Sequence, residues 1–181
     1  MTEFNLQFPL SDVRAIASRY KYTAEDASLE QTFVPFAVHN GFVTSELLYT
    51  LAHWKSPRKA KLCLQNSDTD VREITRNAFS SPSEKWRIQS LLSLHGVAWP
   101  TASVILHFAF QPKIYPVLDF RALESLGVPK VSHGFLFWIE YVEFTRLLAS
   151  EANVDMRTLD RALWQFSREK DAAAACDSEC R

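Results

Sequence analysis

The chain has 181 residues, which is enough for one domain with a full hydrophobic core. Apolar residues make up 47% of it, which excludes a disordered protein, and only four residues are glycine, which disfavours a β-sandwich rich in tight turns. The formal net charge is −1, so any contact with nucleic acid has to depend on a local basic patch or on backbone amides.

Three cysteines, Cys63, Cys176 and Cys180, form neither a disulfide framework nor a CxxC zinc pair. Their sparse use is typical of a reducing compartment. The N-terminus has no basic and apolar signal-peptide pattern, and no apolar run is long enough to cross a membrane. We therefore expect a cytoplasmic monomer with no membrane contact, metal or cofactor.

The first eighty residues predict helices with polar starts. Helices are expected to begin at Ser11, at Thr44, at Ser56-Pro57 and at Asp68 or Thr69. Residues 23–43 are expected to be irregular. A short strand over 32–38 is an alternative that Pro35 weakens.

The remainder predicts further helices and a tail. Helices are expected over 83–95, over 101–110 before Gln111-Pro112-Lys113, from Asp119 to Gly127, over 135–151, and from Asp155 or Thr158 onward. From about residue 169 the chain is polar and Ala-rich, which indicates a flexible tail. The prediction is an all-α, multi-helix globular domain over 1–168, with roughly eight to ten helices, followed by a flexible tail over 169–181.

The short turn Gly96-Val97-Ala98 joins two of the predicted helices. In a helix-hairpin-helix, such a turn and the start of the second helix present free N–H groups that suit one phosphate. Val97 would then point into the core, and Trp99 would lie beside the phosphate. The alternative is an ordinary helical hairpin with a glycine cap, which is common in helical proteins.

Asp119 follows the apolar run 114–118 and precedes a helix. The structural interpretation is an N-cap that accepts a backbone N–H bond. The functional interpretation is compatible with it, because the helix N-terminus favours the charged carboxylate. A carboxylate in a cleft can stabilise a developing sugar cation or orient a water molecule.

Residues 91–127 resemble the hairpin and the Pro-Asp loop of the helix-hairpin-helix base-excision DNA glycosylase superfamily. The matching hairpin run is Leu94, His95, Gly96, Val97, Ala98, Trp99, Pro100, Thr101 and Ala102, and Asp119 takes the place of the superfamily's acid. The resemblance implies that Gly96, Val97, Ala98, Trp99 and Thr101 bind the DNA backbone. It also implies that a base is flipped out of the duplex and that Asp119 is catalytic.

The chain departs from the superfamily pattern at four points. Ala98 replaces the second hairpin glycine, His95 stands where proline is usual, and Pro100 stands where bifunctional members carry the Schiff-base lysine. The cysteines that hold an iron–sulfur cluster in some members are missing. The resemblance therefore points to a monofunctional glycosylase or an inactive relative, without an iron–sulfur cluster.

The stretch 53–61 is the most basic part of the chain, and Lys55 and Arg58 could hold phosphates while Trp54 stacks on a base. A solvated helix start with a buried Trp54 is the structural alternative. Trp54, Tyr115 and Trp138 are candidates for the walls of a base pocket, although core packing is the alternative for Trp138.

The sequence thus predicts a DNA glycosylase-like hydrolase that flips a damaged or modified base and cleaves its N-glycosidic bond. The alternative is a non-catalytic helix-hairpin-helix DNA-binding module, or a relative used for protein contacts. The target base, and whether the setting is repair or defence against modified foreign DNA, stay open.

Overall fold

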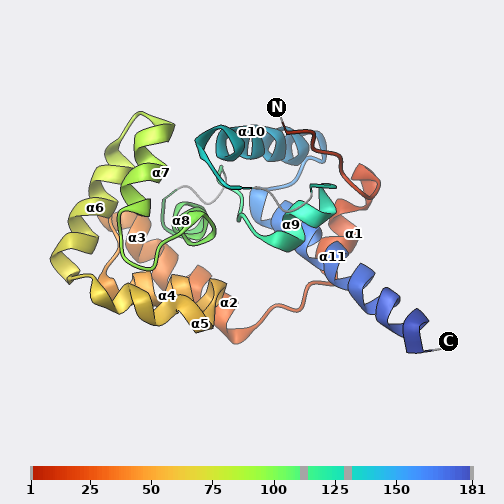
Figure 1. The fold of residues 1–181 in the computed structure, drawn as a ribbon, viewed down its shortest axis with the longest axis horizontal. Helices are drawn as coiled ribbons and strands as arrows, with labels where there is room; N and C mark the ends of the chain where they lie inside the picture. Colours follow the sequence, from red (N-terminus) through yellow and green to blue (C-terminus); the bar gives the residue numbers. More distant parts are fainter. Residues whose placement is uncertain (1, 111–113, 129–131, 180–181) are drawn as a thin grey trace. The chain divides into compact units, whose positions relative to one another are not determined.

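The computed structural model describes residues 2–110, 114–128 and 132–179, and these residues contain helices, turns and loops but no strand. The prediction of an all-α protein is confirmed. The chain divides into two compact units (Figure 1): unit 1 comprises Met1–Lys21 and Leu118–Arg181, and unit 2 comprises Tyr22–Val117. The prediction of one domain over 1–168 stays a prediction.

Unit 2 is a cluster of short helices around α8. In chain order its elements are α2 (Ala24–Ser28), the π-helix η2 (Leu29–Phe33), α3 (Val34–Asn40), α4 (Ser45–Lys55), α5 (Pro57–Ala60), the 3₁₀-helix η3 (Lys61–Gln65), α6 (Asp68–Ser80), α7 (Glu84–Leu92), α8 (Trp99–Ile105) and the π-helix η4 (Leu106–Phe110). Thr101 to Ile105 are all buried, and α4 and α7 pack against α8 (Figure 1). The α7–α8 hairpin is thus anchored by its second helix.

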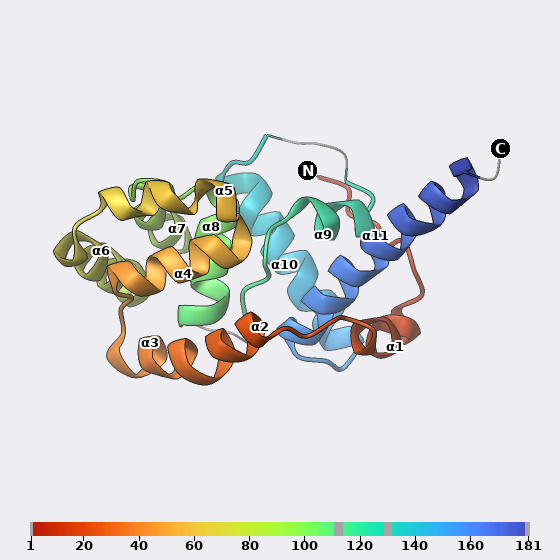
Figure 2. The same cartoon turned by 90° about the horizontal axis from the view of Figure 1, so that it is seen from below.

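Unit 1 is built around a long C-terminal helix. Its elements are the 3₁₀-helix η1 (Leu10–Asp12), α1 (Val13–Ser18), α9 (Phe120–Ser125), α10 (Phe135–Glu151) and α11 (Met156–Glu179). Helices α1, α9 and α10 contact α11 (Figure 2). The N-terminal segment joins the same unit, because the N–H of Asn5 and the N–H of Gln7 donate to the carbonyls of Leu126 and Ser125.

Side-chain caps fix several helix starts where the sequence places them. Thr44 accepts the N–H of Leu47 at 3.1 Å, Asp119 accepts that of Ala122 at 2.8 Å, and Asp155 accepts that of Thr158 at 2.7 Å. These three predicted starts are confirmed. The start predicted at Asp68 or Thr69 is wrong by one residue, because Ser67 is the cap.

The prediction that residues 23–43 are irregular is wrong, as is the alternative strand over 32–38, because the segment is mostly helical. Thr23 and Asp26 form a capping box that starts α2. Pro35 lies in the first turn of α3, which follows the π-helix η2 without a break. Gly41 ends α3 in the left-handed conformation, with φ 69°.

The helix predicted over 101–110 begins earlier, at Trp99, and changes to a π-helix at Leu106. Its predicted end at Gln111-Pro112-Lys113 lies outside the described residues. Helix α11 continues through 169–179, where we predicted a flexible tail. None of the described helices combines the length and the apolar character that a membrane span requires.

Candidate nucleic-acid interface

The turn between α7 and α8 lies directly on η3. Gly96 has φ 76°, and a Cβ atom at this position would come within 2.8 Å of the backbone nitrogen of Cys63 and of the Cβ of Leu62. No side chain fits in this space, and the left-handed conformation also favours glycine. Gly96 therefore allows the hairpin turn to approach the segment that follows the basic stretch.

Asn66, just after η3, is hydrogen-bonded to the same turn. Its side chain accepts the N–H of His95 and donates to the carbonyl of His95. Val97 is buried, as the hairpin interpretation expects, and its N–H donates to Leu94. The turn is thus fixed on both sides of Gly96.

Ala98 does not strain the turn. Its φ of −107° and ψ of 176° are extended, so the position needs no glycine, and it serves as the N-cap residue of α8. Within the described ranges, the N–H groups of Gly96, Ala98 and Trp99 have no hydrogen-bond acceptor. Thr101 is buried one turn further on. Unpaired amides at a helix start are the donors that a phosphate oxygen requires.

The basic stretch over 53–61 ends at the first residue of η3, the element against which this turn packs. Lys55 ends α4 and is half-buried, whereas Arg58, Lys59 and Lys61 are exposed and have no carboxylate partner among the residues described. The sequence contains no acidic residue from position 47 to position 67. Because Leu62 and Cys63 contact Gly96, the structure brings the basic stretch and the hairpin turn together within unit 2.

Two of the three aromatic residues predicted to line a base pocket also lie in unit 2. Trp54 is half-buried, donates to Asp26 at 3.2 Å and meets the ring of Phe108 edge-on at 5.0 Å. Tyr115 is 1% exposed, and its hydroxyl lies 2.8 and 2.9 Å from the carboxylate oxygens of Glu84. Both side chains are thus held by partners inside unit 2.

The third predicted pocket residue, Trp138, lies on α10 of unit 1 and is 0% exposed. It belongs to the core of that unit. The role of Trp54, Tyr115 and Trp138 in a base pocket stays a prediction.

Asp119 lies in unit 1 at the start of α9 and is half-buried. Its charge acts on Tyr141, a fully buried residue of α10. Burial, and then the charges of Asp160 and Asp119, hold the pKa of Tyr141 well above its usual range. Tyr141 therefore stays a neutral phenol close to two carboxylates.

Sequence reasoning missed two residues beside the predicted site. Asn66 could not be linked to His95 from sequence, since the two positions are joined only by tertiary packing. Phe120 follows Asp119 directly and is 69% exposed, although its apolar character suggests the core. The exposed face of a helix as short as α9 leaves too weak a periodic signal to show this.

In the part of the chain that the structure describes, no three His, Cys, Asp or Glu side chains come together as a group that could hold a metal ion. The buried Cys63 is a free thiol, and burial raises its pKa. No family model, curated protein or solved structure matches this chain.

Proposed function

We propose that the protein is a monofunctional DNA glycosylase that grips the DNA backbone through the α7–α8 turn and uses Asp119 in hydrolysis. The observation that carries this proposal is the meeting of two features in unit 2. The amides of Gly96, Ala98 and Trp99 have no acceptor among the described residues and lie in a turn packed on η3. The exposed cations Arg58, Lys59 and Lys61 lie in η3 and the helix before it. Amides and cations in one segment suit a phosphate backbone.

The proposed reaction breaks the bond between the sugar carbon C1′ and a base nitrogen, and the bonding electrons leave with the base. Asp119 stabilises the sugar cation that develops and orients the attacking water, whose oxygen bonds to C1′. One proton of that water is transferred to the departing base. Pro100 offers no amine, so the proposal contains no Schiff-base step.

Base release from DNA that carries damaged or modified bases tests this proposal. Asp119→Asn is the informative variant, because asparagine keeps a side-chain oxygen that can cap α9 while the negative charge is lost. We expect base release to fall by a factor of about a hundred or more. Asp155→Asn, which changes the N-cap of α11 in the same unit, is the matched control and should release base at the wild-type rate. If Asp119→Asn releases base as fast as wild type, Asp119 is not the catalyst.

A second candidate is a DNA-binding module without catalysis. It is favoured by the location of the turn and the cations, because unit 2 holds all of these backbone-binding groups while Asp119 belongs to unit 1. Salt-dependent DNA binding by wild type, with no base released from any substrate, would support this candidate over the first.

A further inference from the structure

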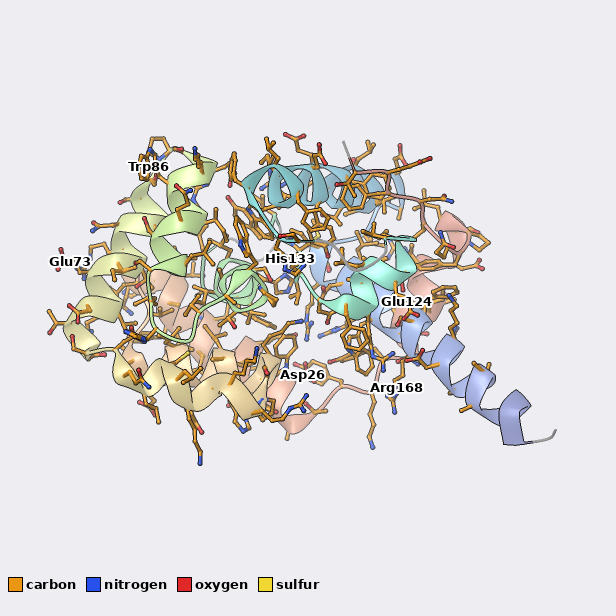
Figure 3. All side chains as sticks on the ribbon, viewed as in Figure 1. Asp26, Glu73, Trp86, Glu124, His133 and Arg168 are labelled. Carbon is orange, nitrogen blue, oxygen red and sulfur yellow. The ribbon has the colours of Figure 1, made fainter. Side chains whose placement is uncertain are left out.

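A ladder of alternating aromatic rings and guanidinium groups joins α9 to α11 in unit 1. The guanidinium carbon of Arg121 lies 4.9 Å from the centre of the Phe120 ring and 5.6 Å from that of Trp164. The guanidinium carbon of Arg168 lies 5.4 Å from the Trp164 ring. We call Phe120, Arg121, Trp164 and Arg168 the α9–α11 ladder. Figure 3 labels Arg168 on α11 and Glu124 on the neighbouring α9.

The two outer members of the ladder face solvent. Phe120 is 69% exposed, and Arg168 is exposed and has no carboxylate partner within the described part of the chain. Trp164 is half-buried, and its ring meets Tyr20 edge-on at 5.3 Å. The ladder thus ends in a solvent-exposed aromatic ring on α9 and in an arginine on α11 that has no carboxylate partner among the described residues.

Arg121, the cation between the two rings of the ladder, is already paired with a carboxylate. Arg121 donates to Asp171 at 2.8 Å and to Ser167 at 3.2 Å. This carboxylate opposes the binding of an anion at Arg121. Arg168 is therefore the member of the ladder that can bind a phosphate. Asp171 is the group that lowers the affinity of this surface for an anion.

We propose that the ladder binds an unpaired nucleotide of a DNA strand, with a base stacked on Phe120 and a phosphate at Arg168. Every base has a face that stacks on an aromatic ring, and arginine adds cation–π and phosphate contacts, so rings and guanidiniums together suit single-stranded nucleic acid. The inference rests on the proposed function, because it places the substrate strand beside Asp119, the residue next to Phe120. It narrows the substrate class to DNA with at least one unpaired nucleotide.

The test is fluorescence anisotropy of a fluorescein-labelled oligothymidylate strand, titrated with the full chain at low salt. Phe120→Ala should weaken binding about fivefold or more. The matched control is Leu136→Ala, an exposed apolar residue on α10 of the same unit. Arg168→Ala should also weaken binding, whereas Lys170→Ala, which removes an exposed cation two residues away, should change it less.

A gain-of-affinity variant makes the test independent of folding defects. Asp171→Asn removes the negative charge that opposes an anion at Arg121, so it should tighten binding of the strand. Glu143→Gln removes an exposed carboxylate on α10 and should leave binding unchanged. Wild-type affinity in Phe120→Ala, or equal effects of Asp171→Asn and Glu143→Gln, would overturn the inference.

Failure of this inference differs from failure of the proposed function. If Phe120→Ala binds the strand like wild type while Asp119→Asn has lost base release, the ladder does not bind the strand and the glycosylase proposal is retained. If variants of the ladder lose strand binding but wild type releases no base, the binding role of the ladder is retained and the catalytic proposal fails.

Discussion

Asn66 holds the backbone of His95 at both of its polar groups. Its side-chain oxygen accepts the N–H of His95 at 2.9 Å, and its amide nitrogen donates to the carbonyl of His95 at 3.0 Å and to that of Cys63 at 2.8 Å. One side chain therefore links the end of η3 to the residue before Gly96. It fixes the turn in the position where the amides of the hairpin lie beside the basic stretch.

Asn66→Ala removes these side-chain bonds, and we expect the free energy of unfolding to fall by about 1–3 kcal/mol. The affinity for duplex DNA should fall as well, because the turn is no longer held on η3. Urea denaturation and anisotropy measure the two effects. Asn77→Ala, an exposed asparagine of α6 in the same unit, is the control and should change neither. Unchanged stability in Asn66→Ala would contradict the role assigned to this side chain.

Gly96→Ala should destabilise the protein more than Gly41→Ala does. Both glycines have positive φ, so alanine at either position costs about 1–2 kcal/mol. A Cβ atom at Gly41 meets nothing within 4 Å, whereas one at Gly96 meets backbone at 2.8 Å, which adds about 1–3 kcal/mol. Equal destabilisation in urea would show that the turn does not pack closely on η3.

Tyr115→Phe should destabilise unit 2 by about 1–3 kcal/mol and leave base release unchanged. The substitution leaves the Glu84 carboxylate without the hydroxyl donor, and it removes one acceptor of Arg87, whose Nη1 lies 2.8 Å from the Tyr115 oxygen and 3.1 Å from Glu84. Thermal unfolding measures the loss. Tyr49→Phe is the control, because its hydroxyl has no partner among the described residues. A loss of base release without a loss of stability would instead assign Tyr115 to the base pocket.

Unit 1 should lose part of its stability in acid through the pair that joins α1 to α11. Hydrogen bonds from Arg19 lower the pKa of Glu169 to about 2, against the opposing effect of burial. A lowered pKa stabilises the folded state above the ordinary value near 4.5, and this stabilisation is lost as the pH falls toward 2.

Glu169→Gln should therefore show a smaller loss of stability between pH 4.5 and 2 than wild type. The side chains of Glu169 and Arg19 are 37% and 50% exposed, so solvent screening keeps the difference below about 1 kcal/mol. Glu143→Gln should follow the wild-type curve. An identical acid profile in Glu169→Gln would mean that the pair does not stabilise the fold.

The sequence was sufficient for features that depend on neighbouring residues. The caps at Thr44, Asp119 and Asp155 were predicted because each side chain bonds a backbone N–H three residues on. The prediction failed over 23–43, for which an irregular segment is expected and a strand over 32–38 is the alternative that Pro35 weakens, because the capping box at Thr23 starts a helical segment there. There, local hydrogen bonds outweighed residue preference.

The candidate site depends on contacts between distant segments, and these could not be predicted. The sequence indicates the amides of the turn and the basic stretch separately, but their proximity depends on the approach of Gly96 to Leu62 and Cys63. The sequence allows Trp138 a place either in the core or in a pocket, and its burial comes from the tertiary packing of α10. Periodicity in one chain does not carry this information.

The salt dependence of duplex DNA binding tests the central claim most directly, since both proposed functions require unit 2 to bind the DNA backbone. Wild type should bind at low salt, with an affinity that falls as salt rises. The variant Arg58→Gln/Lys61→Gln should reduce the slope of log K against log salt by just under one, about 0.9, for each cation removed. The matched variant Arg76→Gln/Lys85→Gln removes one arginine and one lysine elsewhere in unit 2 and should keep the wild-type slope. No binding at low salt, or the same slope in both variants, would contradict the account.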